Sequence, residues 1–329
     1  MFKNFDWKNA SVGLNHLIVG GLFAAIALMN TSCGSDSSSG SSTEPDEKIS
    51  EESSSSVKSS SSTNSSSSVN SSGEESLVTV AAFNDLPECT DNREDEWIRV
   101  TSEARNYFCF RQKWYKTVKI GSQVWMAENL DFQLPKKFYD ETTNFRSKYG
   151  MLYTWTAAMD TNGLFSNNTR GCGIGPKCDA KYPVRGICPK GWHLPAKEEF
   201  ETLVETVGGV DVAGKKLKAT DGWSTVSNFE NGWGYLGTNA NGTDDYGFTA
   251  LPAGVRDDEV NGTGYETRFW TSTEGDIYKE DYFDEGYEQA FYLELTVDYK
   301  DEDVSRDGNK ALIEHFYKEQ GYSVRCVKD

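Results

Sequence analysis

The chain has few histidines and too few basic residues to balance its acids. It holds 3 histidines in 329 residues, and 33 Lys and Arg stand against 51 Asp and Glu, which gives a formal net charge of −18. The phosphate backbone of nucleic acid repels a chain of this charge, so we expect no nucleic-acid partner. With so few histidines, the motif "ICPKGWHLPAKEEF", in which Cys188 precedes His193 by five residues, is the main candidate for a Cys/His pair.

The apolar run from Leu17 to Met29 is too short to span a bilayer comfortably, but it has the length of a signal-peptide core. Lys3 and Lys8 precede it as a weakly basic segment. The run therefore predicts a signal for export, either that of a lipoprotein or a plain secretory signal. The remaining alternative is a buried apolar segment.

The residues that follow this run favour the lipoprotein. Small residues Thr31 and Ser32 directly precede Cys33 in "MNTSCGS", with Asn30 where Leu is usual. This stretch resembles the bacterial lipobox, whose cysteine is diacylated and becomes the mature N-terminus. We expect residues 1–33 to be a lipoprotein signal peptide with Cys33 as the lipidation site, since two acyl chains suffice for stable anchoring.

Residues 34–76 are dominated by serine and offer almost nothing to bury. Such a segment cannot offset the conformational entropy lost on ordering, so it is predicted to be a disordered linker. The composition changes at Leu77, where "WIRV" and "YFCFRQKWYK" predict short strands. Residues 77–117 are expected to form a small β module, with Cys89–Cys109 as the simplest staple because so short a segment builds little core.

Six cysteines remain once Cys33 is set aside: Cys89, Cys109, Cys172, Cys178, Cys188 and Cys326. An even set in an exported chain indicates disulfides, but six cysteines allow 15 connectivities and the sequence does not choose among them. A metal site at Cys172, Cys178, Cys188 and His193 would need C-x5-C-x9-C-x4-H spacing, which differs from the usual zinc knuckles. A Cys172–Cys178 disulfide closing the loop "CGIGPKC" fits better, and we expect no metal and no cofactor.

The remainder, residues 118–329, is long enough for one domain with an α+β pattern. "PAKEEFETLVETVGG" is the clearest helix, with Phe200, Leu203, Val204 and Val207 at helical spacing. "YGMLYTWTAAMD" and "VAGKKLKA" predict further helices. "YGFTALPAGVR", "RFWTSTE", "AFYLELTV" and "GYSVRCVKD" predict strands separated by long loops.

Several stretches in this domain match one family in the same order. They are "IGSQVWMAENLD", "YGMLYTWTAAMD", "ICPKGWHLP", "GFTALPAGVR", "FWTSTE" and "YSVRCVKD". They resemble the Fibrobacter succinogenes major paralogous domain, usually found in exported lipoproteins. The layout of that domain is in turn similar to the C-type-lectin-like fold shared with formylglycine-generating enzymes, an analogy at the level of the fold.

The resemblance implies that Cys188 and Cys326 form a disulfide that closes the domain. It also implies that Trp192 and Leu194 enter the core on either side of His193, which makes this motif scaffold. A Cys/His nucleophile would instead require a thiolate and a positioned base. We therefore expect the closing disulfide and no catalytic residue.

Acidic loops are candidates for calcium. "DEDVSRDGNKAL" lacks the glycine and the final glutamate of an EF-hand loop. "NGTDDYG" and "EGDIYKEDYFDEG" could offer oxygens to a loop-type calcium site, but we interpret them as solvated acidic loops.

The aromatic residues divide into two groups. Trp125, Trp155, Trp192 and Trp270 lie in the family motifs and are predicted to be core. The second group lies in loops rich in glycine and asparagine and comprises Trp223, Trp233, Tyr235, Tyr246 and Tyr265. Exposed aromatic faces there would suit stacking on sugar rings, whereas buried ones would pin the loops to the core.

These features predict a lipid-anchored, non-enzymatic binding or scaffold protein of the cell envelope, on the outer membrane and either periplasmic or surface-exposed. Its expected partner is polysaccharide or another envelope protein. One alternative is an oxidoreductase related to formylglycine-generating enzymes, but the late strands between Gly247 and Tyr322 hold none of the cysteines that this chemistry needs. The other alternative is a purely structural envelope protein.

Overall fold

The computed structural model describes residues 77–93, 95–134, 146–173, 178, 180–224, 240–276, 288–300 and 305–329. The predicted signal peptide, Cys33 and the serine-rich linker lie outside these residues. The described ranges belong to one unit, Ser76–Asp329. None of the helices described in it has both the length and the apolar character needed to cross a membrane.

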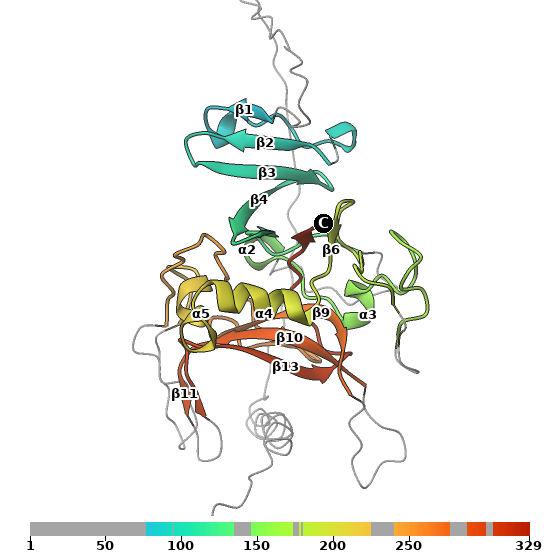
Figure 1. The fold of residues 1–329 in the computed structure, drawn as a ribbon, viewed down its shortest axis with the longest axis vertical. Helices are drawn as coiled ribbons and strands as arrows, with labels where there is room; N and C mark the ends of the chain where they lie inside the picture. Colours follow the sequence, from blue (N-terminus) through green and yellow to red (C-terminus); the bar gives the residue numbers. More distant parts are fainter. Residues whose placement is uncertain are drawn as a thin grey trace, which may run out of the picture. The chain divides into compact units, whose positions relative to one another are not determined.

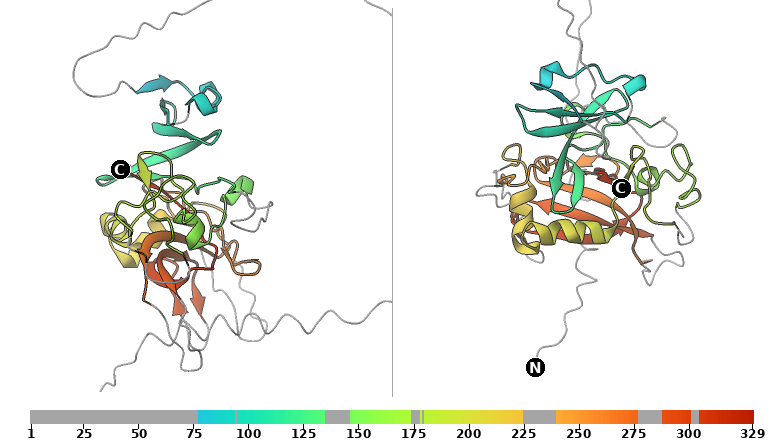
Figure 2. Two further views of the ribbon diagram at one scale, coloured as in Figure 1. Left: turned by 90° about the vertical axis from the view of Figure 1, so that its right-hand side faces the viewer. Right: turned by 45° about the horizontal axis from the view of Figure 1, so that its top comes forward.

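The larger sheet has seven strands in the order β1-β2-β3-β4-β5-β14-β6 (Figures 1 and 2). Its strands are β1 (Val78–Val80), β2 (Trp97–Val100), β3 (Arg105–Phe110), β4 (Lys113–Ile120), β5 (Gln123–Met126), β6 (Trp192–His193) and β14 (Val327–Lys328). Only the pairing of β1 with β2 is parallel among these strands. β4 crosses the boundary expected at residue 117, so the segment 77–117 continues into the domain within one sheet.

Aromatic and β-branched residues make these strands, as the sequence predicts. β3 and β4 are joined by Arg111 and Gln112, whose φ angles of 49° and 62° are those of a type I′ hairpin turn without glycine. Two 3-10 turns, η2 (Phe83–Asp85) and η3 (Asp91–Arg93), precede β2. The Cys89–Cys109 disulfide fastens this segment to β3.

The second sheet is antiparallel, in the order β13-β10-β9. It contains β9 (Glu266–Glu274), β10 (Gln289–Thr296) and β13 (Ala311–Tyr317). β9 and β10 match the predicted strands "RFWTSTE" and "AFYLELTV", whereas β13 was not expected. Two short hairpins complete the strands: β7 (Val255–Arg256) with β8 (Val260–Asn261), and β11 (Tyr299–Lys300) with β12 (Ser305–Arg306).

Two helices cover one face of this second sheet (Figure 1). α4 (Lys197–Thr206) and α5 (Val210–Leu217) confirm the two helices predicted there, and α4 buries Phe200, Leu203 and Val204. The helix predicted over "YGMLYTWTAAMD" is wrong in extent, because α3 covers only Trp155–Ala158. Tyr153 pairs its backbone with Tyr322 instead, and this long-range pairing displaces the first helical turn. A further single turn, α2, spans Arg146–Tyr149.

The second sheet is buried on both faces, because neighbouring side chains enter opposite hydrophobic clusters. Phe269 and Leu293 join the cluster beneath α4 and α5, while Trp270 and Tyr292 join the other. The four tryptophans predicted to be core, Trp125, Trp155, Trp192 and Trp270, are all fully buried.

The end of the chain closes the domain. β14 lies between β5 and β6, and Cys326 just before it is bonded to Cys188. The third disulfide is Cys172–Cys178. All three expected disulfides are therefore confirmed, in a mixed α+β unit dominated by sheet.

Candidate functional site

His193 lies on β6, opposite Val327 of β14, and both of its ring nitrogens face carboxylates. Nδ1 is 2.6 Å from Oδ1 of Asp329, and Nε2 is 2.9 Å from each carboxylate oxygen of Glu199. Burial lowers the pKa of His193, but the hydrogen bonds to Glu199 and Asp329 raise it and prevail, so the pKa lies above its ordinary value. The two carboxylates favour the protonated ring, which links β6 to α4 and to the residue that follows β14.

Cys188 offers His193 no nucleophile, because its sulfur is bonded to Cys326. The Cys/His catalytic alternative and the Cys/His metal alternative are both excluded by the disulfides, since Cys172 and Cys178 are bonded to each other. In the described ranges, no group of three or more His, Cys, Asp and Glu side chains could hold a metal ion.

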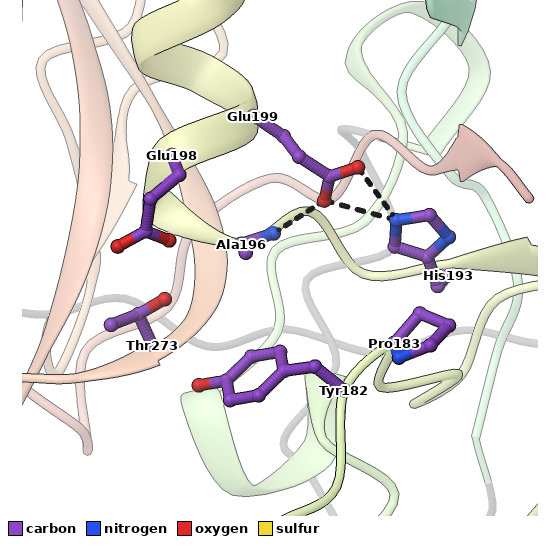
Figure 3. A pocket seen from close by; sticks show the side chains of 7 residues that line it. All are labelled: Tyr182, Pro183, His193, Ala196, Glu198, Glu199 and Thr273. Atoms are coloured by element: carbon purple, nitrogen blue, oxygen red, sulfur yellow. Dashed lines mark hydrogen bonds and ion pairs between the residues drawn. The ribbon is translucent and has the colours of Figure 1, made fainter.

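An open hollow of about 640 Å³ lies beside His193 (Figure 3). It is lined by Tyr182, Pro183, His193, Ala196, Glu198, Glu199 and Thr273. These residues come from four places: the loop before β6, β6 itself, the start of α4, and the end of β9. The hollow therefore forms only when segments about 90 residues apart in the chain are brought together by the fold.

Hydrogen bonds make the walls of the hollow rigid. The Ala196 amide donates to Oε2 of Glu199 at 2.8 Å, which satisfies one of the unpaired amides at the helix start. The next amide, that of Lys197, donates to the hydroxyl of Thr273 on β9 at 3.0 Å. The Ser272 amide in turn donates to the Pro195 carbonyl at 2.7 Å. Strand β9 thus caps the start of α4, and two hydrogen bonds join the two elements.

Two side chains face the open space with groups left for a ligand. Tyr182 is 55% exposed, and its hydroxyl donates to the Ser272 carbonyl at 3.3 Å. Glu198 is exposed, and its carboxylate has no hydrogen-bond or ion-pair partner among the described residues. In Figure 3 the Glu198 carboxylate and the Tyr182 ring lie on either side of the Thr273 hydroxyl. An aromatic face beside hydroxyl-binding oxygens suits a sugar ring, which has an apolar body and polar edges.

The sequence reasoning missed this group of residues. Glu198, Tyr182 and Thr273 are not among the site residues that the sequence predicts. A tyrosine followed by proline in an aperiodic loop is a weak signal, and only the fold places it opposite α4.

Three of the five aromatic residues proposed from the sequence lie in the described part of the chain, and none of these three lines the hollow. Of the two alternatives for Trp223, the structure supports the buried one: the residue is 3% exposed, and its indole nitrogen donates to the Ala250 carbonyl at 3.0 Å. Tyr246 and Tyr265 are half-buried and pack against the cluster beneath α4 and α5. Trp233 and Tyr235 lie outside the described residues.

In the acidic loop "NGTDDYG", one of the two carboxylates forms hydrogen bonds with a neighbouring residue of the chain. Asp244 accepts hydrogen bonds from the amide and the hydroxyl of Thr249, at 2.6 and 2.7 Å. Most of the second acidic loop, residues 277–287, lies outside the described residues.

The family model of the Fibrobacter succinogenes major domain matches residues 118–328, more than half of the chain. The chain belongs to this family. No curated protein and no solved structure is significantly similar to the chain. Every residue that lines the hollow lies within the matched Fibrobacter succinogenes major domain, whereas β1, β2 and β3 precede it.

Proposed function

We propose that this chain is a lipid-anchored, non-enzymatic binding protein of the cell envelope that recognises polysaccharide at the hollow beside His193. The observation that carries the proposal is the exposed ring of Tyr182 beside the carboxylate of Glu198, which has no partner among the described residues, on walls fixed by hydrogen bonds. A preformed site loses little entropy on binding, so few contacts suffice for selectivity.

A C-type-lectin-like fold for the domain is part of this proposal. Two features support it: the last strand, β14, returns to pair with β5 near the start of the domain, and the long-range Cys188–Cys326 disulfide closes the chain beside it. The pair of helices on a three-stranded antiparallel sheet is consistent with the same layout.

The absence of catalysis is proposed from the state of the reactive groups. The alternative related to formylglycine-generating enzymes needs a reactive cysteine pair, and all six cysteines from Cys89 onward are in disulfides. Both ring nitrogens of His193, the histidine that lines the hollow, are hydrogen-bonded to carboxylates. The bonded cysteines are therefore not free to act as nucleophiles, and His193 is not free to act as a general acid or base.

The anchor is proposed at Cys33, on the lipobox-like residues before it and the serine-rich linker after it. We expect Cys33→Ser to release the protein from the membrane fraction of the expressing cells, because one cysteine carries both acyl chains. Partitioning into detergent measures this. A variant that partitions as the parent does would contradict the anchor.

Binding is tested with the full chain in detergent against plant and bacterial polysaccharides, first on a glycan array and then by calorimetry. Loss of the Tyr182 ring in Tyr182→Ala should weaken binding about 5- to 150-fold, taking the scale of base stacking on aromatic side chains. Phe83→Ala is the matched control, since Phe83, in the 3-10 turn η2, is an exposed aromatic residue that does not line the hollow. No glycan bound at millimolar concentration would favour the purely structural alternative, and an envelope protein captured in its place would make the scaffold role the better account.

A further inference from the structure

A second pocket has the opposite charge to the rest of the protein. Its volume is about 260 Å³, and its charged lining consists of five cations, Arg105, Lys113, Lys116, Lys148 and Arg325, and one carboxylate, Glu128. In a chain of net charge −18 this local excess of cations is unusual. It lies between β3, β4, α2 and the last segment before β14, and it shares no lining residue with the hollow beside His193.

The single carboxylate does not neutralise the pocket. One oxygen of Glu128 accepts the backbone amide of Lys116 at 2.7 Å, so the carboxylate is held against the strand. Arg325 is 1% exposed and makes all of its hydrogen bonds to uncharged groups: the amide oxygen of Asn129 at 2.8 Å, the carbonyl of Thr249 at 2.9 Å and the carbonyl of Phe248. Burial lowers the pKa of Arg325 to about 9, which still leaves the guanidinium charged at neutral pH. A buried cation without a paired carboxylate gives the pocket a positive potential.

Several donors in the lining are left for a ligand. Among the described residues, the Lys116 ammonium has neither a hydrogen bond nor an ion pair, and its neighbour Lys113 is 3.8 Å from an Asp131 oxygen. Lys148 is exposed, and its ammonium lies 5.1 Å from the centre of the Tyr149 ring, with no hydrogen bond or ion pair to any residue that the structure describes. Arg105 donates through Nη1 to the Gly247 carbonyl at 3.1 Å, which leaves Nη2 without an acceptor in the described part of the chain.

The base of the pocket is preformed. Asn129 donates to the Tyr149 carbonyl at 2.8 Å and to the Ser323 hydroxyl at 3.2 Å while it accepts from Arg325. Gly150 allows this close approach: its φ is 74°, and a Cβ there would lie 2.9 Å from the Leu130 carbonyl oxygen. A rigid, cation-lined base of this size fits a compact anion and is smaller than most pockets that hold drug-sized ligands.

We propose that this cationic pocket binds a compact oxyanion, a carboxylate or a phosphate, carried by a ligand no larger than a monosaccharide. The unpaired ammonium groups of Lys116 and Lys148 and the second guanidinium nitrogen of Arg105 provide charge-assisted hydrogen bonds to its oxygens. The acidic exterior repels anions at a distance, so the affinity comes from contacts inside the pocket. The site is independent of the proposed polysaccharide hollow and survives if that proposal fails.

The full chain is titrated by calorimetry with four probes: inorganic phosphate, glucose 6-phosphate, galacturonic acid and, as the neutral control, galactose. We expect saturable binding of at least one anion, no binding of galactose at this site, and an affinity that falls as salt is added. Phosphate bound as tightly as glucose 6-phosphate assigns the site to the phosphate group, and preference for galacturonic acid assigns it to the carboxylate. If none of the three anions binds at millimolar concentration, the proposal is wrong.

Two variants locate the site. Lys116→Gln and Lys148→Gln each remove one ammonium group. Each should lower the affinity for the anion about tenfold or more, the scale of one charge-assisted hydrogen bond. Lys119→Gln is the matched control, since Lys119 is an exposed lysine of the same strand β4 that does not line the pocket. Because Lys148 is exposed, its variant should fold even where Lys116→Gln does not. An equal loss in Lys119→Gln would mean a diffuse charge effect and would overturn the assignment.

Discussion

At the scale of the residue, His193 shows what a motif can and cannot tell. The resemblance implied that Trp192 and Leu194 enter the core on either side of His193, and both are buried in the structure. It did not indicate the partners of the imidazole, because Glu199 comes from the following helix and Asp329 is 136 residues away. Spacing along a chain predicts neighbours on one element, whereas ion pairs between elements depend on the completed fold.

Replacement of this histidine should destabilise the protein most in acid. The pKa of His193 is raised in the folded state, so its contribution is fully present below the unfolded pKa near 6.5 and is lost as pH rises through the folded pKa. We expect His193→Gln to cost about 1.5–3 kcal/mol of unfolding free energy at about pH 5, the range for hydrogen bonds to charged groups, and clearly less at about pH 9. Urea unfolding at both pH values measures it.

Asp329→Asn is the companion variant, since it keeps an oxygen near Nδ1 but removes one negative charge. It should reduce the same pH dependence without abolishing it, because Glu199 remains. An equal cost of His193→Gln in acid and in alkali would show that the ring acts by packing alone.

At the scale of the element, prediction succeeded where the periodicity of side chains and the tertiary contacts agree. α4 has three apolar residues at helical spacing and a fourth, Val207, directly after its end, and the sheet beneath it buries that same face. The segment around α3 was also predicted to be a helix, but the backbone of Tyr153 pairs with Tyr322, and the helix is shorter than predicted. β13 was missed because it follows an acidic run, and its pairing with β10 is what makes it a strand.

The joint between β9 and α4 is a specific case of this cooperation. Thr273 accepts the Lys197 amide at 3.0 Å and so caps a helix from a strand 76 residues away. We expect Thr273→Val to lower the unfolding free energy by about 0.5–2 kcal/mol, the usual cost of losing a cap, with little change in side-chain volume. Thr202→Val is the matched control, because the exposed hydroxyl of Thr202 donates to the Glu198 carbonyl within its own helix and joins α4 to no other element that the structure describes. Equal losses in both variants would contradict a capping role for Thr273.

At the scale of the whole molecule, the two pockets of this acidic protein differ in the charge of the side chains that line them. The hollow beside His193 presents an aromatic ring and a carboxylate, whereas the second pocket presents cations. Both depend on the last residues of the domain, since Asp329 fixes His193 and Arg325 forms the base of the cationic pocket. The sequence could predict the family, the longer strands β3, β4, β9 and β10 and, through the family resemblance, the closing disulfide. It could not predict either pocket, because each is assembled from segments with no shared local pattern.

The closing disulfide should therefore stabilise the unit more than the short one. Cys188–Cys326 spans 138 residues, whereas Cys172–Cys178 spans 6. In the loop-entropy model the long loop contributes about 5 kcal/mol and the short loop about 2 kcal/mol, through the entropy each removes from the unfolded chain. We expect the double variant Cys188→Ala/Cys326→Ala to unfold at a much lower urea concentration than Cys172→Ala/Cys178→Ala. Both sulfurs of Cys188–Cys326 are fully buried, so the double alanine also loses packing in the same direction. A short-loop variant that is the less stable of the two would show that native contacts around Cys172, rather than loop entropy, decide the ranking.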